Sequence, residues 1–340
     1  MKNFLKLVTM ALVLAMVFAS CSPSGSGSQA GSSASEGRKD LAIGHTNNEA
    51  HKYHKSMLNF VRLVEEKSQG KYSGQVYPST LGNDKDLFES LQMGTIEFSG
   101  VNSGIISTAA PALGIIDLPF LWKSSEHSRA VLESPIGDGI KKEIIEKAGI
   151  LPLNFWENGF RCYTNNVRAI KNVGDLRGLK FRVMEVPLYI ETFRDAWKSN
   201  PTPMAMSEVY SAMQTGVVDG HDNAADTVFA SSLFEVQKHY SDSRHIWGTY
   251  VFCTSPKFWN SLSAEDQAMF KSASADATDY AWKLSKEITE ESLAKLRNLM
   301  TVTENRDIDI QSFVDSVQGI WEKYSKIYGA ENISKIANFK

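Results

Sequence analysis

Apolar and polar positions along the chain change from one periodicity to another at short intervals. Residues 41–46 (LAIGHT) are mostly apolar and predict a buried strand, and residues 50–71 have the spacing of an amphipathic helix. Residues 72–78 alternate like a second strand. Further on, Ser263 is a suitable cap for a very long helix, and a last amphipathic helix is predicted around 313–328. The strand–helix–strand opening is typical of an α/β fold with a parallel sheet.

One pattern occurs twice, and the offset of the two copies is 208 minus 86, or 122 positions. Residues 86–102 (DLFESLQMGTIEFSGVN) resemble residues 208–223 (EVYSAMQTGVVDGHDN). Each copy predicts a helix stopped by glycine, a two-residue buried strand, an acid and then an asparagine. Chance similarity of two helix ends is one explanation, but we favour a pair of similar lobes. Since ligands bind beyond the carboxyl ends of strands in open α/β sheets, Asn102 and Asn223 are expected to face one cleft.

Two arginines lie in otherwise apolar strand-like stretches, Arg161 in FRCY and Arg182 in LKFRVM. An isolated buried charge is costly, so each needs a partner. The partner of either one could be an internal Asp or Glu, or the carboxylate of a ligand, which a planar guanidinium matches with two parallel hydrogen bonds. Two such arginines beside a predicted cleft strand favour an anion site.

The first forty residues have no pattern typical of a folded core. Residues 1–20 combine two lysines with an apolar run from Leu7 to Phe18, the form of a secretory signal peptide. Small residues directly before Cys21 resemble a lipobox, which predicts a lipoprotein with Cys21 lipidated; an ordinary secretory cleavage is the alternative. Residues 21–39 are rich in Gly and Ser and predict a flexible tether.

The composition is that of an ordinary globular protein, with 42% hydrophobic residues and a formal net charge of -3. Without a basic cluster, nucleic acid is not an expected partner. Any bound anion must be held by local groups and not by the overall field. Cys162 and Cys253 both lie in apolar stretches, so two buried thiols are expected in preference to a disulfide.

A series of motifs recurs in the order found in one transport family. They are EEKSQGK (65–71), YPSTLGND (77–84), DLPFLW (117–122), ENGFR (157–161), DLRGLKFRV (175–183) and NPTPMAMSEVYSAMQTGVVDGHDN (200–223). On these motifs the chain resembles the extracytoplasmic solute receptors of TRAP transporters, the DctP-like substrate-binding proteins. The resemblance covers most of residues 41–260.

This resemblance implies a two-lobe, periplasmic-binding-protein-like α/β fold with a ligand cleft between the lobes and a long bridging C-terminal helix. Lobe I would comprise residues 40–159 and about 249–290, and lobe II residues 160–248 and about 291–340. The implied function is capture of a small organic anion outside the cytoplasm by cleft closure and its delivery to a membrane permease. No enzymatic activity, cofactor or metal is implied, and a monomer is expected.

The resemblance also assigns roles to residues at matching positions. Arg182 resembles the family's principal carboxylate clamp, Arg161 its supporting arginine, and Asn223 the asparagine that ends a VDGQEN-like motif. This chain has His221 and Asp222 where Gln and Glu are usual, so local hydrogen bonding is expected to differ.

Four other residues complete the predicted substrate site. Met206 occupies a position often held by Phe, which would replace a ring-stacking wall with a thioether surface. Asn102 falls where some sialic-acid-binding members carry an acid, which argues against that ligand. Trp156 and Tyr210 are candidate walls for a sugar-acid ring, although core packing explains each equally well.

A metal-binding receptor and an enzyme are the two alternatives to a carboxylate receptor. His45, His51 and His54 cluster near Glu49, which would suit a metal-binding lipoprotein receptor. The stretch 100–104 has the glycine spacing of a nucleophile elbow, but its centre is asparagine and not serine. We therefore favour the carboxylate receptor, with a C4-dicarboxylate, a hexuronate or other sugar acid, and a keto acid all left open as ligands.

Overall fold

The structure is a computed structural model that describes residues 38–340. The predicted signal peptide, the lipidation site Cys21 and most of the predicted tether lie outside the described residues. Residues 38–340 lie within one compact unit. Within residues 38–340, no helix combines the length and apolar character needed to cross a membrane.

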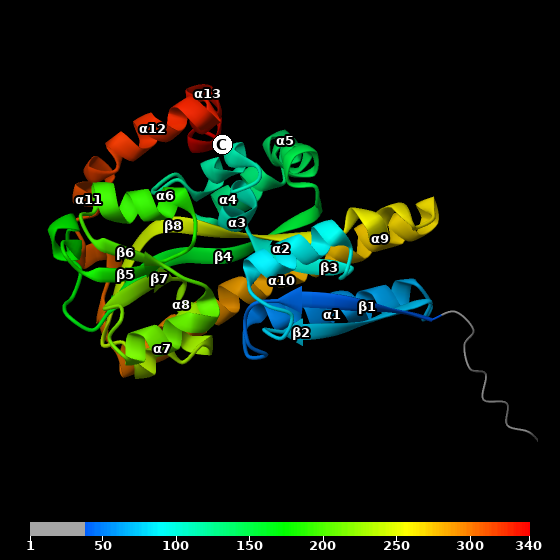
Figure 1. Cartoon of the computed structure of the whole chain (residues 1–340), viewed down its shortest axis with the longest axis horizontal. Helices are drawn as coiled ribbons and strands as arrows, with labels where there is room; N and C mark the ends of the chain where they lie inside the picture. Colours follow the sequence, from blue (N-terminus) through cyan, green and yellow to red (C-terminus); the bar gives the residue numbers. More distant parts are fainter. Residues whose placement is uncertain (1–37) are drawn as a thin grey trace, which may run out of the picture. The chain divides into compact units, whose positions relative to one another are not determined.

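Nine strands form a single sheet in the described part of the chain, in the order β2-β1-β3-β8-β4-β7-β5-β6, with β9 paired to β8 (Figure 1). The strands are β1 (Lys39–His45), β2 (Tyr72–Pro78), β3 (Phe98–Asn102), β4 (Leu151–Asn165), β5 (Lys180–Val183), β6 (Asn200–Pro203), β7 (Gly220–Asn223), β8 (His239–Thr254) and β9 (Thr301–Thr303).

Two parallel groups of strands are joined by two long antiparallel strands. β1 pairs in parallel with β2 and β3, and β5 pairs in parallel with β6 and β7. β4 and β8 pair from Leu151–Thr254 at one end to Asn165–His239 at the other. β3 adds to β8 and β7 adds to β4, both antiparallel. The two long strands therefore pass through both halves of the sheet.

Helices cover the sheet (Figure 1). The α-helices are α1 (Lys52–Lys67), α2 (Asp84–Met93), α3 (Ser103–Ser107), α4 (Ser125–Leu132), α5 (Pro135–Glu143), α6 (Pro187–Glu191), α7 (Val209–Gln214), α8 (Ala225–Ala230), α9 (Pro256–Asn260), α10 (Ala264–Leu299), α11 (Ile310–Ser316), α12 (Gln318–Tyr328) and α13 (Ala330–Ala337). Shorter 3₁₀ and π turns are η1 (Pro111–Asp117), η2 (Ile144–Ala148), η3 (Val173–Leu176), η4 (Thr192–Ala196), η5 (Met206–Glu208), η6 (Leu233–Glu235) and η7 (Asn305–Asp307).

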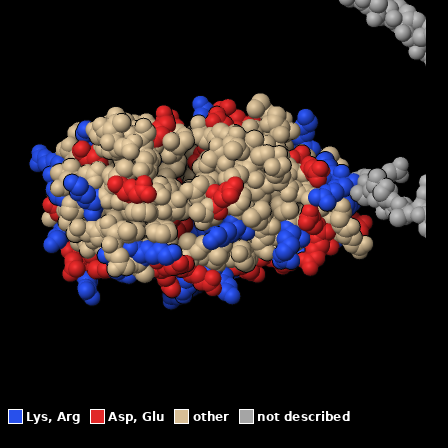
Figure 2. All heavy atoms as spheres, turned by 90° about the horizontal axis from the view of Figure 1, so that it is seen from below, with Lys and Arg blue, Asp and Glu red and all other residues tan. Residues whose placement is uncertain are grey.

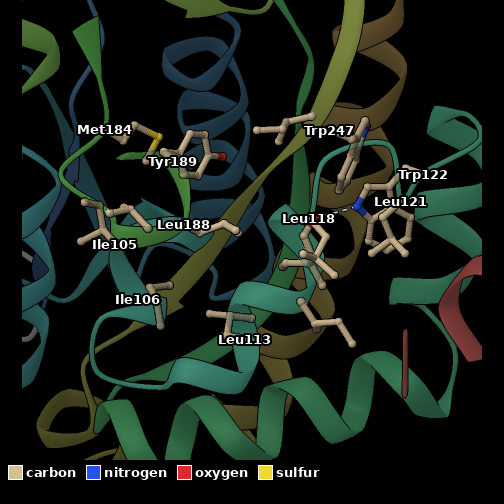
Figure 3. Packing of buried hydrophobic residues seen from close by; sticks show 14 of the residues in the cluster. Ile105, Ile106, Leu113, Leu118, Leu121, Trp122, Met184, Leu188, Tyr189 and Trp247 are labelled. Atoms are coloured by element: carbon tan, nitrogen blue, oxygen red, sulfur yellow. Dashed lines mark hydrogen bonds between the residues drawn. The ribbon is translucent and has the colours of Figure 1, made fainter. Parts of the chain in front are cut away.

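Three hydrophobic clusters make up the core, and α10 contributes to all of them. The largest packs η1, α6 and the C-terminal helices around residues such as Tyr189 and Trp247 (Figure 3). It also includes Trp282 of α10. A second lies among α1, β1, β3 and β8 and includes Phe270 and Ala277 of α10. The third lies among α7, α8 and β8 and includes Leu296. The long helix thus ties the three clusters together.

Most predicted elements are confirmed. β1, α1 and β2 occupy the predicted positions, and α10 begins after Ser263, whose hydroxyl oxygen accepts a hydrogen bond from Asp266 N at 3.1 Å. Cys162 and Cys253 are separate buried thiols, as predicted.

Two local predictions are wrong. The single last helix over 313–328 is instead two helices, because the backbone of Val317, with φ −91° and ψ 2°, departs from helical geometry between α11 and α12. The two-residue buried strand predicted after Gly94 and after Gly216 is absent in both copies: Thr95 is exposed and β3 begins only at Phe98, while Val217 is 55% exposed and β7 begins only at Gly220. Asp219 holds this turn, since its backbone N–H donates to Lys180 O at 2.7 Å.

A close approach between β3 and β8 gives a stability prediction. A Cβ at Gly100 would lie 1.8 Å from Cε1 of Tyr250, whose ring stacks on Tyr53 with centroids 3.7 Å apart. We expect Gly100→Ala to lower the free energy of unfolding by about 1–3 kcal/mol, because the ring has no room to withdraw. The control is Gly139→Ala in α5, where no atom lies within 4 Å. Denaturation in urea measures both, and equal stability of Gly100→Ala and the unmodified protein would contradict this packing.

Candidate functional site

Arg161 of β4 has an internal carboxylate partner, Asp222 of β7. Its Nε donates to Asp222 Oδ2 at 2.5 Å, and its Nη2 donates to Oδ1 at 3.0 Å and to the Asp222 carbonyl oxygen at 2.5 Å. His245 Nε2 lies 3.2 Å from the same Oδ2. The antiparallel register places Asp222 opposite Tyr163, so that Asp222 lies diagonally across from Arg161 on the same face of the sheet. Of the two kinds of partner predicted for Arg161, an internal acid or a ligand carboxylate, the structure shows the internal acid.

Burial and charge act in opposite directions on this pair. Both side chains are almost fully buried, which by itself disfavours ionisation of each. For Arg161 the negative charge of Asp222 outweighs burial, and its pKa is raised. For Asp222 the charge of Arg161 and the hydrogen bonds from His245 and Arg161 hold the pKa well below its usual range. The pair is therefore a permanent internal ion pair.

Arg182 of β5 is held differently. Its Nε and Nη2 both donate to Met204 O, at 3.0 and 2.7 Å. The residue is only 4% exposed, yet no carboxylate of residues 38–340 lies within 4.0 Å of its guanidinium nitrogens. Burial, together with the positive charge of Arg161, lowers the pKa of Arg182 to about 10. It is a buried cation whose Nη1 makes no hydrogen bond to the described part of the chain.

Arg182 borders two adjoining cavities. The inner chamber, of about 30 Å³, is lined by Thr46, Asn47, Tyr53, Asp84, Asn102, Asn158, Arg161, Arg182, Met184, Met206, Asn223 and Thr227. The outer chamber, of about 220 Å³, shares five of these residues (Thr46, Asp84, Arg182, Met184 and Met206) and is further lined by Ser79, Gly82, Asn83, Lys85, Asp86, Ile105, Glu185, Met204, Ala205 and Ser207. Residues of both parallel strand groups thus meet at one cavity.

A larger open groove of about 860 Å³ lies elsewhere, beside α7, β8 and β9. It is lined by residues such as Gln237 and Lys238 and by none of the predicted site residues. It holds no buried arginine, so the two adjoining chambers are the better candidate for an anion site.

The structure brings five predicted site residues together: Arg182, Arg161, Asn102, Asn223 and Met206 all line the inner chamber. Asn102 and Asn223 end β3 and β7, in accord with their predicted place at strand ends. The Asn223 Oδ1 accepts from Ala224 N at 3.0 Å, and within residues 38–340 its Nδ2 has only the Met206 sulfur, at 3.9 Å. Asn223 can therefore offer its amide N–H groups to a ligand.

The other two predicted site residues lie outside both chambers. Trp156 is 1% exposed, its Nε1 donates to Thr278 Oγ1 at 2.9 Å, and its ring stacks on Phe252. Tyr210 of α7 donates its hydroxyl to Glu235 Oε2 at 2.8 Å. The core-packing explanation is correct for Trp156, and Tyr210 is held away from the chambers by its contact with η6.

Sequence reasoning missed Asp84, which lines both chambers. It is the first residue of α2, directly after the capping residue Asn83, and acids are common there in any helix. Both its oxygens accept hydrogen bonds from Asn102 Nδ2, each at 3.0 Å. Burial raises the pKa of Asp84, and these hydrogen bonds and the charge of Arg182 oppose the shift. No local signal separates such an acid from an ordinary helix start.

Of the three histidines in the predicted cluster, two contact each other and the third has a different partner. His45 Nε2 lies 3.1 Å from His54 Nδ1, whereas His51 Nε2 lies 3.1 Å from Thr227 Oγ1. Burial lowers the pKa of His45 to about 3, which keeps its ring neutral. Over residues 38–340, no three His, Cys, Asp or Glu side chains are grouped so that they could hold a metal ion.

A two-part sheet around a cavity, with a buried arginine that has no direct ion-pair partner among the described residues, is an arrangement suited to enclosing a small anionic solute. Residues 43–327 match the DctP family, bacterial extracellular solute-binding protein family 7. The chain therefore belongs to this family of binding proteins, which are not enzymes.

Individual relatives agree with this assignment. A solute-binding protein of Verminephrobacter eiseniae is 35% identical over 283 residues, 82% of each chain. The C4-dicarboxylate-binding periplasmic protein DctP of Rhodobacter capsulatus is 30% identical, over 83% of this chain and 85% of that one. A TRAP periplasmic solute-binding protein of Polaromonas, solved with bound D-erythronate, superposes with a TM-score of 0.85 and 32% identity, covering 88% of this chain and 99% of the other.

The internal ion pair gives a second prediction. Asp222→Asn leaves Arg161 buried without a counter-charge, so the free energy of unfolding should fall by about 3–5 kcal/mol. Asp195→Asn, which breaks the exposed pair with Arg194, should change it little. Urea denaturation measures both, and a negligible effect of Asp222→Asn would mean that Arg161 is neutralised by another group.

Proposed function

We propose that this protein captures a small organic carboxylate at Arg182 and delivers it to the membrane permease of a TRAP-type transporter. The observation that carries the proposal is the buried guanidinium of Arg182 at the junction of the two chambers, which has no carboxylate of residues 38–340 within 4.0 Å. Burying a cation without a counter-charge is costly, and an anionic ligand removes that cost. The ligand carboxylate would complete a charge pair for which the chain supplies only one half.

Donors around Arg182 suit a carboxylate. The Nη1 of Arg182 and the Nδ2 of Asn223 have no oxygen acceptor among the described residues, and both side chains line the inner chamber. A planar guanidinium and an amide can together saturate a carboxylate group. Arg161 acts indirectly, because its own charge is taken up by Asp222 and adds mainly to the local positive potential.

The face drawn in Figure 2 gives no sign of long-range attraction for anions. Figure 2 shows acidic and basic side chains interspersed over one face, and the whole chain has a formal net charge of -3. Selectivity for an anion is therefore a property of the chambers. The relatives described above, with a C4-dicarboxylate and D-erythronate as their ligands, support a small organic acid as the class.

We also propose two lobes that close on the ligand and a lipid anchor at Cys21. The predicted lobes, residues 40–159 with about 249–290 and residues 160–248 with about 291–340, would close on the ligand by bending at the long strands β4 and β8. Closed and open populations would then report to the permease whether cargo is present. Cys21 would carry the lipid that holds the receptor at the membrane surface, with residues 21–39 as its tether.

Removal of the clamp gives a third prediction. Arg182→Ala should weaken binding of a carboxylate ligand by several kcal/mol, since a charge-assisted pair in a closed cavity is lost. Thermal shift with D-erythronate, D-glucuronate and succinate, each beside its neutral amide, identifies a ligand. At a hundredfold its dissociation constant, a ligand adds about 2.7 kcal/mol of stability.

Titration calorimetry with that ligand then compares Arg182→Ala with Arg194→Ala, a change at an exposed ion pair outside the chambers. Arg194→Ala should bind like the unmodified protein. Unchanged affinity in a folded Arg182→Ala protein would reject Arg182 as the clamp.

A further inference from the structure

A buried ion pair joins α1 to α8. Lys52 Nζ of α1 lies 3.0 Å from Asp226 Oδ2 of α8, and the two side chains are 2% and 0% exposed. Along the chain, α1 follows β1 and α8 follows β7, so the two charges come from different strand groups of the sheet. The pair therefore connects the two halves of the molecule.

Lys52 has two further partners, both on its own side of the pair. Its Nζ donates to Asn158 O of β4 at 2.9 Å and to Ser285 Oγ of α10 at 3.0 Å. Asn158 lies at a bulge of β4, where the pairing with β8 shifts register. Both acceptors belong to predicted lobe I, as Lys52 does, so Lys52 would keep them if α8 moved away.

Asp226 has no such support. Its carboxylate oxygens accept no well-aligned hydrogen bond from residues 38–340, so the contact with Lys52 is one of charge. The other nearby group is His51 Nε2, at 3.5 Å. Burial and then the charge of Lys52 hold the pKa of His51 well below its ordinary value, so its ring is neutral. Asp226 therefore depends on Lys52 whenever it is buried.

The contrast with Asp222 separates two kinds of buried pair. Asp222 accepts three hydrogen bonds from Arg161, and the strands β4 and β7 that carry the two residues are paired to each other. That ion pair is fixed by the sheet. Asp226 has one counter-charge, and this lies on a helix of the other half.

The contact between α1 and α8 is polar. The apolar side chains of α1 pack in the second hydrophobic cluster and those of α8 in the third. Where the two helices meet, His51 Nε2 lies 3.1 Å from Thr227 Oγ1, and Asn48 Nδ2, just before α1, donates to Ala230 O at 2.6 Å. We call this contact the polar seam; it comprises Asn48, His51 and Lys52 on one side and Asp226, Thr227 and Ala230 on the other.

Helix α10 shows the same change of character beside the seam. Between Trp282 and Leu296 its buried residues are Ser285 and Ser292. Separation of the polar seam would hydrate charged and hydrogen-bonding groups and would expose little apolar surface, so the main cost of apolar hydration is avoided. The seam is thus a place where the halves can part without loss of the hydrophobic clusters.

The polar seam adjoins the inner chamber. Tyr53 follows Lys52, Thr227 follows Asp226, and both line the chamber together with Asn158. The Tyr53 hydroxyl donates to Asn158 Oδ1 at 2.9 Å. A ligand in the inner chamber therefore lies next to the groups that hold the seam together.

We propose that the Lys52–Asp226 ion pair is a latch, formed when the two halves close on a ligand and broken when they open. This inference rests on the proposed function, because it takes ligand capture as the event that closes the halves. The latch would contribute to ligand affinity and not to the stability of the ligand-free protein.

The energetic argument depends on where each charge is solvated. In the open form water reaches both groups, and an ion pair between exposed groups contributes little. In the closed form the pair is buried, and loss of one partner leaves the other charge unpaired. The apparent affinity of a ligand follows the population of the binding-competent form, so a weaker latch lowers affinity without any change at the ligand itself.

The first test is Asp226→Asn, with whichever of D-erythronate, D-glucuronate and succinate stabilises the unmodified protein in thermal shift. Titration calorimetry and stopped-flow mixing should show affinity lower by about thirtyfold or more, mainly through faster dissociation. Urea unfolding of the ligand-free variant should match that of the unmodified protein. Asp276→Asn is the control: it removes the partner of Lys67, 2.9 Å away on the same helix α1, and should change neither measurement.

A double-mutant cycle then assigns the effect to the pair. Lys52→Met, Asp226→Asn and the double variant are compared for ligand affinity and for ligand-free unfolding. The double variant should bind more tightly than the two separate losses together predict, because no charge is left unpaired in its closed form. In ligand-free unfolding the two changes should add without coupling.

Each other outcome is decisive. Equal coupling in ligand-free unfolding, or failure of Asp226→Asn to fold without ligand, would show a permanent pair and overturn the latch. Unchanged affinity in Asp226→Asn, where Arg182→Ala abolishes binding, would overturn the latch and leave the proposed function intact. Absence of binding of all three acids to the unmodified protein would overturn the proposed function, and the latch with it.

Discussion

The buried pair of Arg161 and Asp222 is the interaction on which the site depends. Two arginines close together in a low-dielectric interior repel each other, and both would need a counter-charge. The chain supplies one internal carboxylate, and the contacts from Arg161 and His245 hold it ionised. Arg182 receives only a backbone carbonyl. Among the described residues Arg182 therefore has no carboxylate within 4.0 Å, although Asp84 lines the same chambers, and this lack of a direct partner is the chemical basis that we propose for binding an anion.

The frame that holds Arg182 in place is made by the two long strands. β4 and β8 pair over their whole length, so the strand group of β1 to β3 and that of β5 to β7 are built on a common pair. Both groups then present their polar ends, Asn102 and Asn223, to the same inner chamber. Helix α10 supports this arrangement by packing into all three hydrophobic clusters.

Several features were predictable because they depend on residues that are near one another along the sequence. Apolar spacing located β1, α1 and β2, and Ser263 marked the start of α10. The repeated helix–glycine–strand pattern pointed to Asn102 and Asn223 as strand ends. Local pattern was insufficient for Trp156, because an aromatic residue of a strand has the same appearance in a core as in a binding site. It also failed at Val217, where an apolar residue occupies an exposed turn.

By itself, the sequence determined the order of elements, the need of both strand arginines for partners and, through its motifs, the family that the chain resembles. It could not decide which arginine has an internal partner. That depends on the register of β4 against β7, which brings Asp222 beside Arg161, 61 residues away along the chain. The place of Asp84 in the chambers was likewise decided by tertiary structure. Charge compensation depends on distances in space, and only the folded chain defines them.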